Sequence, residues 1–367
     1  MKIAIVGGGI GGLSAAIALE HGGHDVQVYE RAEAYADVGS GLSLWPNALV
    51  ALDAIGIGAE VRDRRAVVPP VEITDPRGRT LSRIDPVAFA ERYGEIAMIH
   101  RADLLDVLRG RLADGTLRRG VEVTSVSADG TVRHTAGVSA FDLVVGADGV
   151  RSSTRYALWS HASEPRYAGY GAWRMITEPV RLDVAGEVWG RGARFGYAPL
   201  PDGRAYCFAV VGTPPGVQHH GLDEISRRFA GWHQPIPALL DATDPAAVLY
   251  HDLYEAPRLQ SYVCGRVVLL GDAAHGMTPN LGQGAGQAIE DAVSLGTVVA
   301  NGDDLAAYDR LRLRRTRGIA ARSRMLGRLG QLASSPAAGV RDAVMRATPS
   351  SAVLRSFASV LDWRPPA

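Results

Sequence analysis

The chain has 367 residues, and its 39 lysines and arginines balance 39 aspartates and glutamates, so its formal net charge is zero. A neutral chain has no overall field that would attract nucleic acid or an anionic membrane, and we expect neither a nucleic-acid partner nor integral membrane association. The two cysteines, Cys207 and Cys264, are too few for a disulfide framework, which predicts two small buried side chains in a cytoplasmic protein.

The first 29 residues have the pattern of a strand, a turn, a helix and a second strand. A short apolar run at 3–6 stops at a glycine, residues 13–21 have helical character, and 25–29 form a second apolar run. This order is typical of a βαβ unit at the start of a doubly wound parallel sheet.

The rest of the chain changes character several times. A turn at Pro46 and Asn47 precedes helical spacing over 49–55, and prolines interrupt short β-like pieces over 67–99. Alternating patterns over 166–264 indicate a second, mostly antiparallel sheet. We also expect a helix over 101–112, buried strands at 141–145 and 267–270, and helices over 284–299 and 305–362.

These patterns predict an α/β fold, in which a doubly wound, Rossmann-like domain carries an inserted, mostly antiparallel β-sheet domain and C-terminal helices. We assign the dinucleotide-binding domain to residues 1–70, 98–165 and 265–330, the inserted sheet to 71–97 and 166–264, and a helical tail to 331–367.

A GxGxxG turn follows the first strand. Its glycines, Gly7, Gly9 and Gly12, allow a tight turn and let backbone N–H groups and a helix N-terminus approach a pyrophosphate. Glu30 stands eighteen residues after Gly12, at the end of the second strand, where a carboxylate can accept both hydroxyls of an adenosine ribose. The alternative is a glycine-rich turn with a solvent-facing Glu30, but the context on both sides favours dinucleotide binding.

A second glycine-rich turn indicates which dinucleotide binds. Asp272 follows the strand expected at 267–270, and Pro279, Gly282 and Gly284 lead into the helix expected at 284–299. A carboxylate at this place can accept hydrogen bonds from a ribityl chain, which a flavin has and a nicotinamide dinucleotide lacks. The positive end of the helix would stabilise the negative charge of reduced flavin, so we expect FAD.

In order and spacing, the GxGxxG with Glu30, the central Gly146-Ala147-Asp148-Gly149 and the late Gly271-Asp272 resemble the motifs of the group A FAD-dependent aromatic hydroxylases. That family of flavoprotein monooxygenases includes salicylate and 3-hydroxybenzoate hydroxylases, urate hydroxylase and zeaxanthin epoxidase. The resemblance covers residues 1 to about 330. It implies the following FAD-binding residues: Gly7, Gly9, Gly11, Gly12, Glu30, Arg31, Ser43, Arg101, Val123, Asp148, Asp272, Pro279, Gly282, Gly284, Ala285 and Gly286.

The resemblance also implies the reaction. FAD would take a hydride from NADH or NADPH, bound transiently because no second GxGxxG unit follows another strand, and would react with dioxygen to give a C4a-hydroperoxyflavin. The distal oxygen would hydroxylate a small aromatic, heteroaromatic or apolar substrate, and the protein, a monomer or homodimer, would hold the substrate and exclude water. No metal is expected.

The substrate residues are expected on the inserted sheet. With a three-residue loop at 201–203, Arg194, Ala198, Tyr206 and Phe208 share one face, whereas a two-residue loop would separate Arg194 from Tyr206. Their spacing is similar to urate hydroxylase, where an arginine and a tyrosine orient the substrate, and Arg174 precedes them. Asn280 stands where the urate enzyme has an aspartate, and an asparagine cannot be a general base. The alternative is a surface arginine and a tyrosine at the edge of the core.

Other polar residues receive structural interpretations. We expect His275 to be a hydrogen-bonding residue under the flavin loop, and His219 and His220 to face solvent. Eight arginines between 310 and 328 are expected to be solvated, as charge runs on terminal helices usually are.

Several other functions share parts of this pattern. A flavin-dependent reductase or dehydrogenase of the same fold, an epoxidase acting on a lipophilic alkene, and a non-catalytic flavin-binding module all remain open, and a plain NAD-dependent dehydrogenase would need no flavin motif. A flavin halogenase would need a lysine beside a tunnel and a WxWxIP stretch, and this chain has Lys2 as its only lysine and lacks that stretch.

Overall fold

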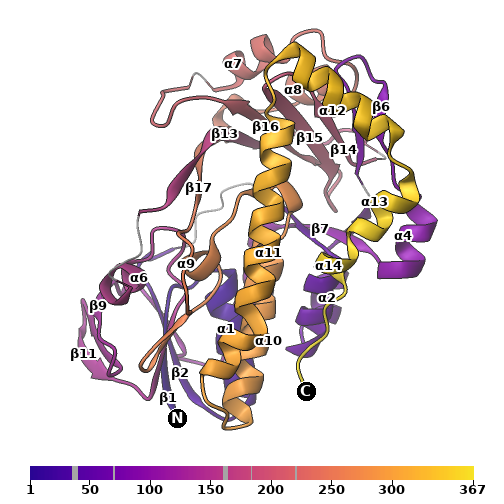
Figure 1. Cartoon of the computed structure of the whole chain (residues 1–367). Helices are drawn as coiled ribbons and strands as arrows, with labels where there is room; N and C mark the ends of the chain where they lie inside the picture. Colours follow the sequence, from indigo (N-terminus) through magenta and orange to yellow (C-terminus); the bar gives the residue numbers. More distant parts are fainter. Residues whose placement is uncertain (35–39, 69–70, 160–163, 183, 220) are drawn as a thin grey trace.

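The computed structural model describes residues 1–34, 40–68, 71–159, 164–182, 184–219 and 221–367. Within them the chain forms a six-stranded sheet, a seven-stranded sheet and two three-stranded sheets (Figure 1). The long helix α11 (Ala306–Gly330) runs along both large sheets. This arrangement confirms the predicted α/β fold with an inserted sheet.

The six-stranded sheet has the order β18-β19-β12-β1-β2-β8. Its neighbours from β19 to β8 pair in parallel, and β18 is an antiparallel edge strand. Runs of valine, isoleucine and leucine form the central strands because both faces are covered, one by helices and the other by a small sheet over 123–140. The strands are β1 (Lys2–Val6), β2 (Asp25–Glu30), β8 (Leu117–Arg119), β12 (Leu143–Gly146), β18 (Val263–Cys264) and β19 (Val267–Leu269).

Helices α1 (Ile10–His21) and α10 (Gly284–Ala300) pack closely together on this sheet. The contact uses small residues, since a methyl group on Gly296 would lie 3.0 Å from the side chain of Ala18. The neighbouring helices are α2 (Pro46–Ala54), α3 (Gly58–Asp63), α5 (Arg101–Gly110), α6 (Ser153–Leu158) and α9 (Asp272–His275). Pro46 is the first residue of α2, so the turn expected there is a helix start, a position that proline favours.

The seven-stranded sheet has the order β17-β13-β16-β15-β14-β5-β6 and is antiparallel except where β14 pairs with β5. Helices α7 (Gly221–Arg228) and α8 (Ile236–Asp241) were not predicted; their apolar residues, such as Ile225 and Leu239, pack with the odd-numbered residues of the sheet. The strands are β5 (Glu72–Thr74), β6 (Thr80–Ser82), β13 (Arg166–Ile176), β14 (Gly186–Trp189), β15 (Ala193–Pro199), β16 (Ala205–Gly212) and β17 (Leu249–Glu255).

The proline-rich stretch over 67–99 contains a helix that the sequence analysis missed. Helix α4 (Pro86–Tyr93) starts with proline, and the carboxylate of Asp85 accepts hydrogen bonds from the N–H groups of Val87 and Ala88. An N-cap aspartate before a proline is a helix-start signal that was available in the sequence. The small sheets join β3 (Gly41–Leu44), β7 (Ile96–His100) and β4 (Ala66–Val68), and β9 (Val123–Val126), β10 (Thr131–His134) and β11 (Gly137–Ala140).

The C-terminal segment folds back onto the molecule. Its helices are α12 (Ser335–Ala347), α13 (Ser350–Ser356) and α14 (Ala358–Leu361). Arg341 of α12 is buried and donates to the carbonyl oxygen of Gly190, and Trp363 is buried in the core around α1 and α2. The division of the chain at 70, 97, 165, 264 and 330 stays a prediction.

Two simpler features complete the fold. Among the described residues, no helix is both long and apolar enough to cross a membrane. Cys207 and Cys264 are both free thiols, and Cys207 is buried as expected, whereas Cys264 on the edge strand β18 is only half-buried.

We predict that the C-terminal segment contributes to global stability. Trp363→Ala should lower the free energy of unfolding by about 3–5 kcal/mol, because it removes a buried indole from the core between α1 and α2. The exposed Arg355, which lies on α13 in the same segment, provides the control Arg355→Ala. Urea unfolding followed by circular dichroism measures both; equal midpoints for the two variants would contradict the prediction.

Candidate active site

The carboxyl ends of four neighbouring parallel strands carry the predicted cofactor residues. Gly7 follows β1, Glu30 ends β2, Asp148 lies two residues after β12, and Asp272 comes shortly after β19. Because these strands are paired in parallel in the order β19-β12-β1-β2, all four residues stand at one edge of the sheet. Ligands of doubly wound sheets bind at this edge.

The turn between β1 and α1 combines tight packing with an open side. A methyl group on Gly12 would lie 2.0 Å from the carbonyl oxygen of Gly7, and Gly7 has a φ of +108°. A methyl group on Gly11 would lie 2.8 Å from the side chain of Leu270. At Gly9, in contrast, a methyl group would meet no protein atom within 4 Å. Gly9 therefore faces open space at the N-terminus of α1, as a pyrophosphate requires.

Glu30 lies against this turn. Its Oε2 accepts a hydrogen bond of 2.8 Å from the N–H of Gly8, and its Oε1 accepts one of 2.9 Å from the N–H of Ala32. The neighbouring Arg31 is exposed, and the half-buried Val123 begins β9 close by, since the N–H of Val121 donates to the carbonyl oxygen of Glu30. The structure thus gathers the residues predicted to hold the adenosine half of FAD.

Asp148 has one carboxylate oxygen in use and one without a partner. Its Oδ2 accepts hydrogen bonds from Ser153 and from the N–H and hydroxyl of Thr154, which fixes the start of α6. Its Oδ1 is buried and has no hydrogen-bond partner within the described residues. An unsatisfied buried acceptor is costly, so a donor from a ligand or water is expected there.

Asp272 and Arg101 are charged residues that interact with each other near α9. Burial raises the pKa of Asp272, while the nearby His275, Arg101 and Arg174 lower it. Burial and the nearby Arg174 lower the pKa of Arg101. Both side chains are nevertheless exposed to solvent, so a ligand can reach them.

The second glycine-rich turn brings β3 against the start of α10. Gly282 has a φ of +61°, and a methyl group on it would lie 2.8 Å from Ser43 Oγ and 2.7 Å from Trp45 Nε1. The turn starts with Pro279, and a methyl group on Gly284 would again meet no protein atom within 4 Å. Ala285 packs against the core around α2, and Gly286 closely approaches Ala48.

These residues fit FAD. Two glycines at the N-termini of α1 and α10 face open space, a buried oxygen of Asp148 lacks a donor, and Arg101 offers a cation for a pyrophosphate. No group of three or more His, Cys, Asp or Glu side chains in the described part of the chain is arranged to hold a metal ion.

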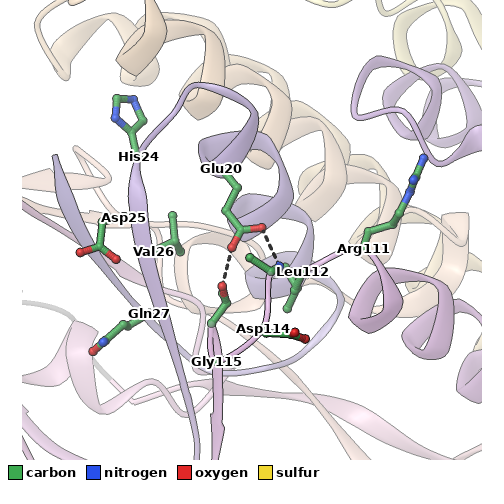
Figure 2. Close-up of a pocket in the computed structure, with 11 residues that line it drawn as sticks. Glu20, His24, Asp25, Val26, Gln27, Arg111, Leu112, Asp114 and Gly115 are labelled. Atoms are coloured by element: carbon green, nitrogen blue, oxygen red, sulfur yellow. Dashed lines mark hydrogen bonds between the residues drawn. The ribbon is translucent and has the colours of Figure 1, made fainter.

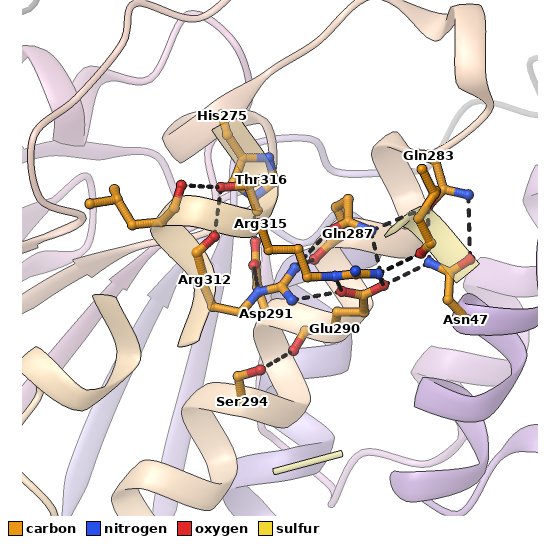
Figure 3. Close-up of polar contacts among 12 residues, drawn as sticks. Asn47, His275, Gln283, Gln287, Glu290, Asp291, Ser294, Arg312, Arg315 and Thr316 are labelled. Atoms are coloured by element: carbon orange, nitrogen blue, oxygen red, sulfur yellow. Dashed lines mark hydrogen bonds and ion pairs between the residues drawn. The ribbon is translucent and has the colours of Figure 1, made fainter. Parts of the chain in front are cut away.

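A buried network of charged and polar side chains lies beside the second glycine-rich turn (Figure 3). Glu290 and Asp291 of α10 are fully buried and pair with Arg312 of α11 at 2.6 Å each, and Arg315 also pairs with Glu290. On the other side, Asn47 of α2 donates to Glu290 at 2.7 Å. The network therefore ties α2, α10 and α11 together beside the flavin-binding turn.

Asp291 also holds the turn that carries Asp272. Its Oδ2 accepts hydrogen bonds from the N–H of Gly271 at 2.8 Å and from His275 Nε2 at 2.6 Å. This contact confirms the structural role predicted for His275. Burial alone would raise the pKa of Asp291, but the charges of His275 and Arg312 and these hydrogen bonds lower it to about 2.

The register of the seven-stranded sheet decides which side chains face the other layer. Because paired residues point to the same side, even-numbered residues of β13, β15 and β16 share one face. The loop at 201–203 has three residues, with Leu200 opposite Arg204, which confirms that Arg194, Ala198, Tyr206 and Phe208 share this face. We call it the substrate face.

Arg194 is buried and already has partners. It donates to Glu187 Oε1 at 3.0 Å and to Asn280 Oδ1 at 2.6 Å. Asn280 in turn donates to the hydroxyl of Tyr170 at 2.9 Å. The structure brings Arg194 and Asn280 together, but no hydrogen bond joins Tyr206 to either of them within the described residues; Tyr206 lies further along the face, against Gly41.

Arg174 occupies the middle of the substrate face. It lies opposite Phe208 on β16 and Leu249 on β17, and it makes no ion pair or hydrogen bond with the described part of the chain. Burial and the charge of Arg174 lower the pKa of His251. The alternation of residues along β13 is the signal in the sequence that places Arg174 on the same face as Tyr206.

Two expectations about polar residues were wrong. The side chain of His219 is 2% exposed, because the aromatic rings of Trp173 and Tyr250 cover it, and it pairs with Glu224. His220 lies outside the described residues. The arginines of 310–328 are not uniformly solvated, since Arg312 is fully buried and Arg324 pairs with the buried Glu255. Both arginines pair with buried acids from other parts of the chain.

A separate cavity of about 620 Å³ lies at the opposite edge of the six-stranded sheet, beside Asp25 at the start of β2 (Figure 2). Its acid, Glu20, already accepts hydrogen bonds from Thr116 and the N–H of Ala113. This cavity is far from the predicted cofactor residues along β2 and takes no part in the site.

A sequence model of the FAD binding domain matches residues 1–185 and 254–320. The chain belongs to this family. The match confirms the family resemblance, and with it FAD as the cofactor. The chain is 39% identical to the aurachin C monooxygenase/isomerase of Stigmatella aurantiaca, over 96% of each chain. It is 34% identical to the FAD-dependent urate hydroxylase of Klebsiella pneumoniae, over 88% of this chain and 89% of the relative.

Structures of this FAD-binding family also share the fold. The structure of Klebsiella pneumoniae HpxO with FAD and uric acid has a TM-score of 0.90 at 30% identity, covering 98% of this chain and 96% of that one. A salicylate hydroxylase substrate complex has a TM-score of 0.81 at 24% identity and shows the fold alone, covering 100% and 98%. The protein is therefore an FAD-dependent oxidoreductase of the monooxygenase type.

We predict that Gly9→Ala separates cofactor binding from folding. Its methyl group meets no protein atom, so the free energy of unfolding of the apoprotein should stay unchanged, whereas FAD affinity should fall at least about tenfold because the methyl group occupies the pyrophosphate approach. Gly339→Ala, on α12 and equally uncrowded, is the control. Fluorescence titration with FAD measures both; unchanged affinity in the Gly9 variant would remove Gly9 from the site.

A second prediction concerns Asp291. Its pKa is lower in the folded than in the unfolded state, so its carboxylate stabilises the fold above its ordinary pKa, and this contribution is lost as pH falls toward 2. Wild-type stability should therefore drop by about 2 kcal/mol from this group alone between pH 5 and 2. Asp291→Asn should lack this part of the drop and be less stable at pH 7 by about 3–5 kcal/mol, since Arg312 and His275 each lose a buried charged partner.

Urea unfolding of both proteins at a series of pH values is the measurement. Identical pH profiles would show that Asp291 does not titrate differently on folding.

Proposed function

We propose that this enzyme uses FAD, NADH or NADPH, and dioxygen to hydroxylate an aromatic or heteroaromatic ring that carries a negative or strongly polar oxygen substituent, such as a phenolate or a quinolone carbonyl oxygen. Bound FAD would supply the redox chemistry. The proposal includes FAD binding by the glycine turns with Glu30, Arg101, Asp148 and Asp272, and a cytoplasmic monomer or homodimer.

One observation carries the choice of substrate. Glu187 neutralises Arg194, and Asn280 accepts a further hydrogen bond from it, so neither the arginine nor the asparagine is free for a ligand. A substrate that needs a base at position 280 is disfavoured, because an amide cannot remove a proton. This argues against urate, whose hydroxylase the chain resembles at 34% identity.

Arg174 is the cation that the substrate face offers. It has no partner in the described residues, it lies beside the phenol of Tyr206, and an unpaired guanidinium in a half-buried position favours an anionic or strongly polar oxygen. The surrounding Phe208, Ala198 and Ile176 are apolar and suit the carbon skeleton of an aromatic ring.

One relative supports a quinolone-like ring. The 2-heptyl-3-hydroxy-4(1H)-quinolone synthase of Pseudomonas aeruginosa is 31% identical over 96% of this chain and 95% of its own.

The first test is consumption of NADH or NADPH by the FAD-loaded enzyme in the presence of a 2-alkyl-4-quinolone, salicylate or urate, with product analysis by mass spectrometry. We expect ligand-stimulated oxidation of the nicotinamide and a product heavier by one oxygen atom with the quinolone. Oxidation without an oxygenated product from any ring would favour a reductase of the same fold.

We predict that Arg174→Gln raises the KM for the substrate about tenfold or more, because one charge-assisted hydrogen bond is worth about 1.5–3 kcal/mol. FAD affinity should stay within about twofold, which separates substrate binding from cofactor binding. Arg166→Gln, eight residues earlier on the same strand, where the arginine pairs with Glu255, is the matched control. An unchanged KM in the Arg174 variant would contradict its role.

A further inference from the structure

Helix α11 carries a groove in which three of the four arginines form no ion pair within the described residues. A cavity of about 460 Å³ lies between this helix and the C-terminal helix α14, which Figure 1 places beside the lower half of α11. Its lining contains no aspartate or glutamate and consists of Arg310, Leu311, Arg314, Arg315, Gly318, Ile319, Arg322, Ser359 and Val360.

The groove arginines differ from the others on the same helix. Arg312 and Arg324 pair with the buried acids Glu290 and Glu255, respectively. Arg310, Arg314 and Arg322, in contrast, form no ion pair within the described residues, and Arg310 and Arg314 are exposed. Three uncompensated guanidinium groups thus surround one cavity.

Two of the groove arginines are held in place. Arg322 donates to Ser359 Oγ at 3.1 Å and to Ser356 Oγ at 3.0 Å. Arg315 donates to the carbonyl oxygen of Val360 at 2.6 Å, and its Nε donates to Glu290. These contacts fix one wall, so a ligand would meet donors whose positions are largely set before it binds.

The chemistry of the lining selects the ligand. One guanidinium group can donate two parallel hydrogen bonds to two oxygens of a phosphate or carboxylate group. Three uncompensated cations together favour a dianion over a monocarboxylate. The floor is apolar, with Ile319 buried and Leu311 partly exposed, which suits an organic group attached to the anion. We propose that this groove is a binding site for a phosphate monoester, either a small soluble one or a lipid headgroup.

The proposal is independent of the substrate assigned above. The groove lies outside the predicted cofactor residues. Its test uses the full chain saturated with FAD, because added phosphate then cannot occupy the pyrophosphate position.

Isothermal titration with inorganic phosphate, at constant ionic strength set with chloride, tests the site. We expect saturable binding to the wild type and at least about tenfold weaker binding to the double variant Arg310→Gln/Arg314→Gln, which loses two charge-assisted contacts. Both residues are exposed and have no partner in the described residues, so the variant should unfold at the wild-type temperature when phosphate is absent. Arg328→Gln/Arg346→Gln removes the same charge outside the groove and should bind as the wild type does.

A second arm identifies the source of the phosphate. Glycerol 3-phosphate competing with inorganic phosphate indicates a soluble ester, whereas co-sedimentation with vesicles of phosphatidic acid in phosphatidylcholine, lost in the groove variant, indicates a headgroup. Absence of saturable phosphate binding to the wild type, or equal binding to both double variants, overturns the proposal.

Discussion

The ion pairs of Glu290 and Asp291 with Arg312 hold α10 and α11 together beside the cofactor edge. Removing such charges from water costs several kcal/mol per ion, and this cost is offset only when each charge has a partner in good geometry. Here the two acids come from α10 and the arginine from α11. Further hydrogen bonds reach the turn at Gly271 and the amide of Asn47 in α2. A helix that slipped along its neighbour would leave buried charges unpaired, so the relative positions of these elements are set closely.

The second constraint is the register of the seven-stranded sheet. A shift by one residue would exchange its two faces and put the Trp173 and Phe195 core where Arg174 and Tyr206 now stand. The hairpin at 201–203 and the apolar core under α7 and α8 both favour the observed register. The substrate face is therefore a consequence of packing on the opposite side of the sheet.

The two parts of the site differ in how much they depend on the rest of the chain. The flavin side uses backbone groups, glycines and short-range turns, and this chain shares that architecture with relatives that act on different rings. The substrate side depends on which side chains neutralise one another. Glu187 pairs with Arg194. Arg174 is therefore the arginine of this face that forms no ion pair within the described residues.

The sequence by itself determined the βαβ entrance and the two glycine-rich turns, because each depends on residues close together in the chain. It left the loop at 201–203 open between two and three residues, and the register of the sheet decided for three. The helices from Arg101 and Gly284 begin where predicted, and the first strands agree to within a residue or two. Helix α4 was missed although its N-cap signal is local, since the prolines around it were interpreted as strand breaks. Only the tertiary structure decided that Arg194 is held by Glu187 and Asn280, that His219 is covered by aromatic rings and that Arg312 is buried. Asn280 and Arg194 lie 86 positions apart, and no periodicity in the sequence shows which distant acid or amide will meet a given guanidinium once the two sheets and α11 pack together.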